Sequence, residues 1–267
     1  MDDAAVSGMR VTSVGAGGPA LFFVHGFACD STDWRAQVSR FEDRTTVITC
    51  DLPGHGESPA VPGGQTIEAY GAEVVRALAD RALPPAILIG HSMGCRVVLE
   101  AARLNPDAVA GLVLIDGSRI GEGDPGAAEK SMADELVGDG YSRFVRAFFE
   151  SMFVASSDPE LVRSISERAR HLSPAVGRPL MADVARWDAG DCVRALAAVR
   201  VPLLAIQSTT MDTARRRVSL EPGMDSPWLD LIRRNVPTAI AAELRGAGHF
   251  PHIERADEID ALIADFA

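Results

Sequence analysis

The chain has 267 residues, a formal net charge of −11, a hydrophobic fraction of 47% and a charged fraction of 24%. These values are typical of one large soluble domain with a substantial hydrophobic core, and they exclude a small disulfide-stapled module. The excess of negative charge would repel a phosphate backbone, so we expect no nucleic-acid partner. No apolar run approaches the roughly 18 residues that span a bilayer, so we expect no membrane contact either.

Smaller features add to these expectations. The start, residues 1–5, is acidic and lacks the basic and apolar parts of a secretory signal, which predicts a cytoplasmic protein. The four cysteines show no C-x-x-C spacing, so we expect them to be reduced and not to bind zinc. The histidines are dispersed, and we predict neither a metal nor a cofactor. The basic run Arg215-Arg216-Arg217 is interpreted as a solvated helix face.

In the first half of the chain the predicted elements alternate between strands and helices. Apolar runs predict a first strand pair before residue 15 and then strands at 19–24, 45–50, 87–89 and 109–115. A helix is predicted to begin at 31–34, with Ser31 or Asp33 as its N-cap, and another covers 66–82. Such alternation predicts a parallel sheet with ligand chemistry at the carboxyl ends of its strands.

This strand rhythm stops after Gly117. The linker 121–126 and several helical stretches, including the aromatic-rich 141–153, predict an inserted helical cap over residues 118–198. The aromatic stripe fits either a core or the wall of a binding pocket. Strands resume at 201–207 and, weakly, at 239–244, before a closing helix at 258–266. The predicted core therefore comprises residues 1–117 and 199–267.

The clearest chemical signal is the string Gly90-His91-Ser92-Met93-Gly94. It separates an apolar strand pattern from a helical pattern, which is the context in which G-x-S-x-G forms a nucleophile elbow. The tight turn lifts the Ser92 oxygen above the sheet edge, and the following helix directs unpaired amides toward it. Ser92 is therefore the candidate nucleophile.

Two other segments are predicted to end at the same edge. His249 follows a glycine turn after the last predicted strand and is the candidate general base for Ser92, ahead of His252 three residues later. The strand 19–24 ends at a His-Gly pair, and this places the Phe27 amide where it can meet the oxyanion. We interpret His25 as a structural ring that fixes its loop.

Together these motifs resemble the α/β-hydrolase superfamily. The resemblance rests on residues 90–94, His25-Gly26-Phe27, the string DLPGHGES at 51–58 and Gly246-Ala247-Gly248-His249. It covers the core from about residue 18 to 116 and from 201 to the end. It implies a mostly parallel α/β-hydrolase sheet with helices on both faces and an inserted helical cap.

The resemblance also implies roles for individual residues. Ser92 becomes the nucleophile, and His249 becomes its general base and later its general acid. The backbone amides of Phe27 and Met93 form the oxyanion hole, and no metal is involved. The implied chemistry is acyl transfer through an acyl-enzyme on Ser92.

The acid of the triad has two candidates. Members of the superfamily usually carry it shortly after the strand that is 201–207 here, where this chain has Met211 and, one residue late, Asp212. Other members place the acid at the end of the strand after the elbow helix, where Asp116 stands. An aspartate at a strand end is also a good turn cap, so each candidate has a structural alternative. Asp116 is favoured, with Asp212 as the alternative.

The leading hypothesis is a serine hydrolase of the carboxylesterase or lactonase type. Its small-molecule substrate is expected to be a small to medium apolar ester, lactone or thioester. A serine at the elbow argues against dehalogenases and epoxide hydrolases, which need a carboxylate there. A carbon–carbon bond hydrolase of the same fold and a non-catalytic small-molecule receptor are the alternatives. The oligomeric state is not predicted.

Overall fold

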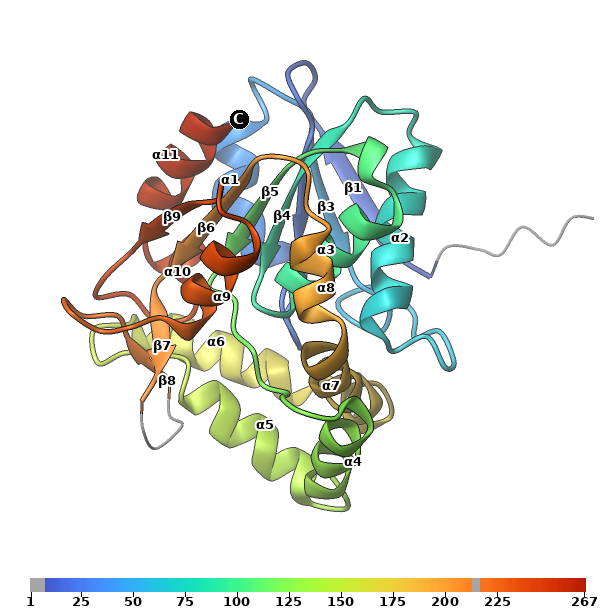
Figure 1. Cartoon of the computed structure of the whole chain (residues 1–267), viewed down its shortest axis with the longest axis vertical. Coiled ribbons are helices and arrows are strands. Elements are labelled where there is room, and N and C mark those ends of the chain that lie inside the picture. Colours follow the sequence, from blue (N-terminus) through green and yellow to red (C-terminus); the bar gives the residue numbers. More distant parts are fainter. Residues whose placement is uncertain (1–7, 213–216) are drawn as a thin grey trace, which may run out of the picture.

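A seven-stranded sheet forms the centre of the computed structural model, which describes residues 8–212 and 217–267 (Figure 1). The strand order is β1-β3-β2-β4-β5-β6-β9, and neighbours are parallel except β1 with β3. The strands are β1 (Arg10–Val14), β2 (Leu21–Val24), β3 (Val47–Asp51), β4 (Ala86–His91), β5 (Val109–Ile115), β6 (Leu203–Gln207) and β9 (Ile240–Glu243). The predicted α/β sheet is confirmed, although β1 alone precedes residue 15 in the described part, where a strand pair was predicted.

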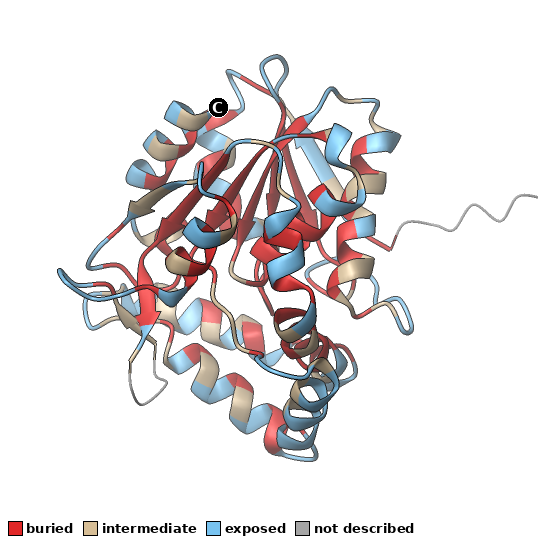
Figure 2. Cartoon of the chain, viewed as in Figure 1, coloured by how far each residue is buried: buried red, intermediate tan, exposed pale blue. Residues whose placement is uncertain are grey.

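Both faces of the sheet are covered by helices, and Figure 2 shows its central strands buried. In β4, Leu88 belongs to one apolar layer, whereas Ile87 and Ile89 belong to the other, because successive side chains point to opposite faces. The first layer packs against α2 (Ile67–Asp80), α3 (Met93–Leu104), α8 (Cys192–Ala197) and α9 (Pro227–Asn235), and the second against α1 (Arg35–Phe41) and α11 (Ala256–Phe266). Two covered faces explain why the strands are continuous apolar runs.

The helices between β5 and the final core strands include α4 (Pro125–Glu135), α5 (Gly140–Glu150), α6 (Pro159–Arg170) and α7 (Pro174–Gly190). We call these four helices the helical insertion. Proline at the first position and a capping side chain before it begin three of them, with Asp124, Asp158 and Ser173 as the caps. In Figure 1 the insertion lies together beyond the carboxyl ends of the strands, while α8 lies beside α3.

A 3₁₀ turn, η1 (Ser31–Trp34), stands where a helix start was predicted, but its cap differs. Asp30 is the N-cap and accepts a hydrogen bond from the Thr32 amide at 2.9 Å. Asp33 is buried instead, and its carboxylate forms an ion pair with Arg168 of α6 at 2.5 Å. The insertion uses this carboxylate as an anchor, so it is not available as a cap. A second such turn, η2 (Pro106–Ala108), precedes β5.

Three further elements complete the fold. A short antiparallel hairpin pairs β7 (Thr209–Met211) with β8 (Arg217–Ser219), and α10 (Pro251–Glu254) precedes α11. Arg217 therefore lies in a strand, and the prediction of a helix face is wrong for it; Arg215, Arg216 and the acidic start lie outside the described residues.

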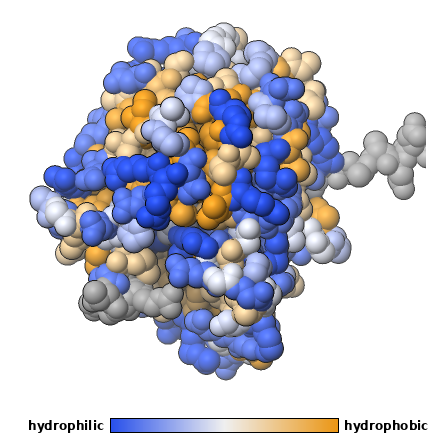
Figure 3. Space-filling view, in the orientation of Figure 1, coloured by the Kyte–Doolittle hydropathy of each residue, from blue (hydrophilic) through white to orange (hydrophobic). Residues whose placement is uncertain are grey.

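The surface bears on the membrane expectation. Among the described residues, no helix combines the length and the apolar character needed to cross a membrane. Figure 3 shows hydrophilic residues interleaved with hydrophobic ones over the face in view.

Candidate active site

Ser92 occupies a strained turn between β4 and α3. Its backbone φ of 54° and ψ of −114° lie in a region that residues other than glycine rarely adopt. A Cβ at Gly90 would stand 2.3 Å from the Gly94 carbonyl oxygen, and a Cβ at Gly94 would stand 2.3 Å from that of Val24. The two glycines of the motif therefore let the strand, the turn and the helix approach closely enough to present Ser92 at the sheet edge.

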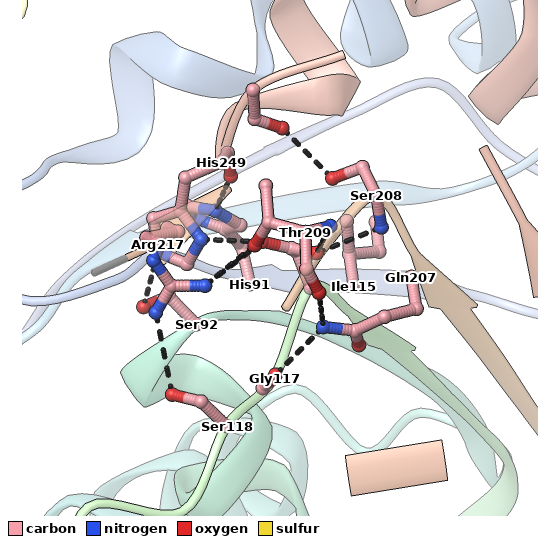
Figure 4. A network of polar contacts seen from close by, with 12 residues as sticks. His91, Ser92, Ile115, Gly117, Ser118, Gln207, Ser208, Thr209, Arg217 and His249 are labelled. Carbon is pink, nitrogen blue, oxygen red and sulfur yellow. Dashed lines mark hydrogen bonds and ion pairs between the residues drawn. The ribbon is translucent and has the colours of Figure 1, made fainter. Parts of the chain in front are cut away.

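His249 lies in the loop after β9, with its ring directed at Ser92 (Figure 4). The distance from His249 Nε2 to Ser92 Oγ is 2.8 Å. Two contacts hold the loop: the His249 amide donates to the Met152 carbonyl at 2.7 Å, and the His91 Nε2–H donates to the His249 carbonyl at 2.7 Å. The candidate base is thus held both by the end of β4 and by the chain just after α5.

Asp116 follows β5 directly, beside the elbow. The Ser92 amide donates to the Ile115 carbonyl at 3.0 Å. The residues that follow β4 and β5 are therefore neighbours at the same edge of the sheet. Asp116 Oδ2 lies 2.6 Å from His249 Nδ1, which completes a continuous chain from Ser92 Oγ to a carboxylate. The alternative acid, Asp212, follows β7. The backbone of Asp116 also has a positive φ, 44°.

The segment after β6 holds the Asp116 carboxylate through hydrogen bonds (Figure 4). The amides of Ser208 and Thr209 both donate to Oδ1 at 2.8 Å, and the Thr209 hydroxyl donates to Oδ2 at 2.5 Å. The Ser208 hydroxyl donates to the Gly248 carbonyl at 2.8 Å, which ties the acid to the His249 loop. Neither residue was assigned a role from the sequence; the signal was a pair of hydroxyl side chains directly after β6, ahead of Met211 at the usual position of the acid.

Arg217 is the other residue that sequence reasoning misplaced. Its side chain is only 6% exposed, and its Nη1 lies 3.3 Å from Asp116 Oδ2. The same nitrogen donates to the Thr209 hydroxyl oxygen at 2.6 Å. Figure 4 shows Arg217, Thr209 and His249 converging on one point. A buried carboxylate attracts a cation strongly, and this explains why Arg217 points inward rather than into solvent.

Charge and burial set the protonation of the pair. Burial lowers the pKa of His249 to about 4 with the help of the Arg217 charge, against the opposing effect of Asp116. Burial alone would raise the pKa of Asp116, but the hydrogen bond and charge of His249, together with Arg217, hold that pKa below its ordinary value. At neutral pH the site therefore contains a neutral imidazole beside an ionised carboxylate.

Phe27 and Met93, whose amides were predicted to form the oxyanion hole, both lie beside Ser92. Phe27 lies in a turn closed by the Cys29 amide donating to the Gly26 carbonyl at 3.3 Å. A Cβ at Gly26 would stand 3.1 Å from the Ser92 Cβ, so this turn packs directly on the serine. Met93 is the first residue of α3, where amides have no partner within the helix. Phe27 thus lines the same space as Ser92, and Met93 follows Ser92 directly in the chain.

The ring of His25 fixes the loop in front of this turn. Its Nδ1–H donates to the Gly26 carbonyl at 2.8 Å, and its Nε2 accepts from the Leu52 amide at 3.0 Å. The structural interpretation of His25 is confirmed. His252, the second candidate base, is buried and packs against Trp34 in a tilted arrangement, with ring centroids 4.4 Å apart.

A small apolar space adjoins Ser92. Its walls come from the elbow, the Phe27 turn, the His249 loop and the chain of α5, and its apolar side chains are Phe27, Phe148, Phe149, Met152 and Phe250. In this conformation the space is too narrow to hold a water molecule. Among the described residues, no group of three metal-binding side chains is arranged to hold an ion.

Comparison with known proteins is consistent with this geometry. The alpha/beta hydrolase family matches residues 21–262. A pimeloyl-acyl-carrier-protein methyl ester esterase from Methylococcus capsulatus is 27% identical over 257 residues, which cover 93% of this chain and 94% of that protein. A dihydrolipoyllysine-residue acetyltransferase component of an acetoin cleaving system from Cupriavidus necator is 27% identical over 97% of this chain and 67% of that protein.

Solved structures share the fold. A thermophilic esterase from Thermogutta terrifontis superimposes with a TM-score of 0.79 at 24% identity, covering 97% of this chain and 92% of that one. An enol-lactonase from Burkholderia xenovorans LB400 superimposes with a TM-score of 0.78 at 22% identity, covering 97% and 95%.

Proposed function

Because this chain belongs to the alpha/beta hydrolase family, we propose that it is a serine hydrolase that forms an acyl-enzyme on Ser92. Its substrate is a carboxylic ester, lactone or thioester of a small to medium apolar molecule. The observation that carries the proposal is the unbroken chain of contacts from Ser92 Oγ through His249 to Asp116, with distances of 2.8 and 2.6 Å. Relatives that are named as esterases support the same class of reaction.

The proposed reaction assigns a role to each of these groups. The neutral His249 Nε2 accepts the proton of Ser92 as Oγ attacks the carbonyl carbon, and Asp116 stabilises the imidazolium at Nδ1. The amides of Phe27 and Met93 donate to the oxyanion of the tetrahedral intermediate. His249 then protonates the leaving oxygen or sulfur. Water attacks the resulting acyl-enzyme with His249 again as the base, and Ser92 leaves with its proton restored.

The substrate class rests on the apolar space beside Ser92. The uncharged walls from α5 and the Phe27 turn favour an apolar acyl group. We propose that the helical insertion acts as the cap within residues 118–198, over a core of residues 1–117 and 199–267. Because the space is this narrow, we propose that its walls, which include side chains of α5, move apart before a substrate and the hydrolytic water enter. A cytoplasmic location stays a prediction.

The first test compares Ser92→Ala with the unmodified protein on p-nitrophenyl esters of increasing acyl length. We expect the variant to lose about 10³- to 10⁶-fold in kcat while the fold is retained, because no other group supplies the nucleophile. Ser164→Ala is the matched control, since Ser164 is exposed on α6, and it should keep full activity. Labelling by a fluorophosphonate should follow the same pattern.

The outcomes separate the alternatives. Full activity of Ser92→Ala would contradict the nucleophile assignment. A wild type that is labelled but cleaves no ester points to lactones or to carbon–carbon bonds as substrates. A wild type that is neither labelled nor active would instead favour the small-molecule receptor.

A further inference from the structure

Arg217 has no step in the proposed reaction, although burying its guanidinium is costly. The side chain is 6% exposed and lies against Asp116 and Thr209, with Nη2 reaching to 3.5 Å from the Ser118 hydroxyl. Arg217 belongs to β8. The hairpin β7–β8 forms a separate two-stranded sheet, and it places the Arg217 side chain at the site. A cation beside the Asp116 carboxylate offsets part of its negative charge. That negative charge is what stabilises His249 when it becomes an imidazolium.

The other charged groups near His249 are matched by their own partners. Arg96 of α3 binds Asp188 through two hydrogen bonds of 2.8 and 2.7 Å, so its charge is balanced by that carboxylate. Arg168 forms ion pairs with Asp30 and Asp33. Arg217, by contrast, shares Asp116 with His249.

The remaining ionisable neighbours add no positive charge. His91 and His252 pack close by, with the His91 ring centroid 4.8 Å from that of His249. Burial lowers the pKa of His252 to about 3 and that of His91 well below its ordinary value, so both rings are neutral. The Glu254 carboxylate accepts from the Gly248 amide at 3.2 Å. The pair Arg217 and Asp116 therefore dominates the local electrostatics of the base.

We propose that Arg217 is a positioning residue that shares the charge of Asp116, so that His249 stays neutral and able to accept the Ser92 proton in mildly acidic solution. This inference rests on the proposed function. Through Thr209, Arg217 also holds the carboxylate in the orientation that His249 needs. The expected consequence is an enzyme whose activity extends to a lower pH than an ordinary histidine would allow.

The test measures kcat/KM from pH 3.5 to 9 for the wild type, Arg217→Gln and Arg217→Lys. The acid limb of this profile reports the base of the free enzyme. We expect Arg217→Gln to move the limb upward by about one to two pH units, the size of effect that a unit charge at this range exerts in a protein. Arg217→Lys keeps the charge and should stay within about half a unit of the wild type.

The matched control is Arg186→Gln. Arg186 of α7 also forms ion pairs with several carboxylates, those of Glu68, Asp183 and Asp191, but it does not contact the triad. Its removal should leave the limb in place. Rates of fluorophosphonate labelling at each pH provide the same limb without a choice of substrate, and circular dichroism at each pH verifies that the protein stays folded.

Several results would overturn the inference. A folded Arg217→Gln with an unmoved limb would do so, as would equal losses in Arg217→Gln and Arg217→Lys at every pH, which indicate a merely structural role. If Arg217→Gln does not fold, Arg217→Met replaces it, and a wild-type limb near the ordinary histidine value of about 6.5 would contradict the inference without any variant. A wild type without hydrolysis or labelling removes the proposed function itself.

Discussion

The sheet edge and the helical insertion approach Ser92 from opposite sides and contribute different kinds of groups. On the sheet side, Ser92 and Asp116 both have positive φ angles, and main-chain hydrogen bonds fix the strands that carry them. On the other side, α5 and the turn after it contribute mainly apolar side chains, including Phe148 and Met152. Chemistry needs atoms placed to a fraction of an ångström, whereas selection of an apolar group needs only shape.

This contrast predicts that changes at the sheet edge act on the rate, while changes in the insertion act on the choice of substrate. One contact joins the two sides at the base itself, since the Met152 carbonyl accepts the His249 amide at 2.7 Å. A movement of α5 that admits substrate therefore acts on the loop of the base as well.

At the sheet edge, the largest effect after that of Ser92→Ala is expected for Asp116→Asn. Asparagine cannot hold the His249 tautomer or stabilise the imidazolium, and we expect kcat to fall by about 10³- to 10⁴-fold. Asp212→Asn is the control and should stay within about threefold of the wild type. Ester hydrolysis under saturating substrate measures both. The reverse pattern, with Asp212→Asn inactive and Asp116→Asn active, would assign the acid to the hairpin.

The residues of the sheet edge were largely predictable from local patterns. The strand 109–115 coincides with β5, and the elbow follows from glycines that only a close approach of backbone explains. The position of the acid was ambiguous because its partner, His249, is 133 residues away and the choice depends on tertiary contact. Arg217 was misread for the same reason, since nothing beside it in the sequence reveals the buried carboxylate.

A smaller effect, on selectivity, is expected for Phe148→Ala. The Phe148 ring lines the space beside Ser92 and meets Phe27 edge to face, with ring centroids 6.5 Å apart. Its removal enlarges the apolar space, and we expect the ratio of kcat/KM for a longer acyl chain over a shorter one to rise by about tenfold. A series of p-nitrophenyl esters measures this ratio.

The control for this variant is Phe144→Ala. Phe144 stacks on Phe148 at 5.1 Å from the same helix but does not line the space. It should leave the ratio within about twofold. An unchanged ratio in Phe148→Ala would mean that the acyl group is bound elsewhere.

The helices of the insertion were predictable from the sequence, but which of their side chains line the space beside Ser92 was not. The helical pattern predicts helices in this region, and 141–153 corresponds to α5. The same aromatic stripe serves both purposes that the sequence left open: Phe149 is fully buried and Phe148 is half-buried, although both line the space. The hairpin β7–β8 was missed because two strands of three residues have too few positions to show a period.

The core and the insertion also differ in the burial of their histidines. This difference leads to the smallest expected effect. Five of the six histidines are buried in the core, at positions 25, 55, 91, 249 and 252, while His171 of the insertion is exposed. Burial lowers the pKa of His252 to about 3, whereas the unfolded chain titrates near 6.5. Between these pH values the unfolded state binds the proton and the folded state does not. The contribution of His252 to the free energy of unfolding is therefore fully present above about pH 6.5 and is lost as the pH falls.

His252→Phe removes one of these proton acceptors without removing a hydrogen bond, because neither ring nitrogen of His252 has a partner among the described residues. Each buried neutral histidine adds about 1.4 kcal/mol per pH unit to the slope of the free energy of unfolding. We therefore expect urea unfolding between pH 4 and 6 to show a slope lower by about that amount, and His171→Gln should leave it unchanged. If His252→Phe retained the full slope, His252 would have to bind its proton in the folded protein as well, and the acid sensitivity of the core would have to come from other histidines.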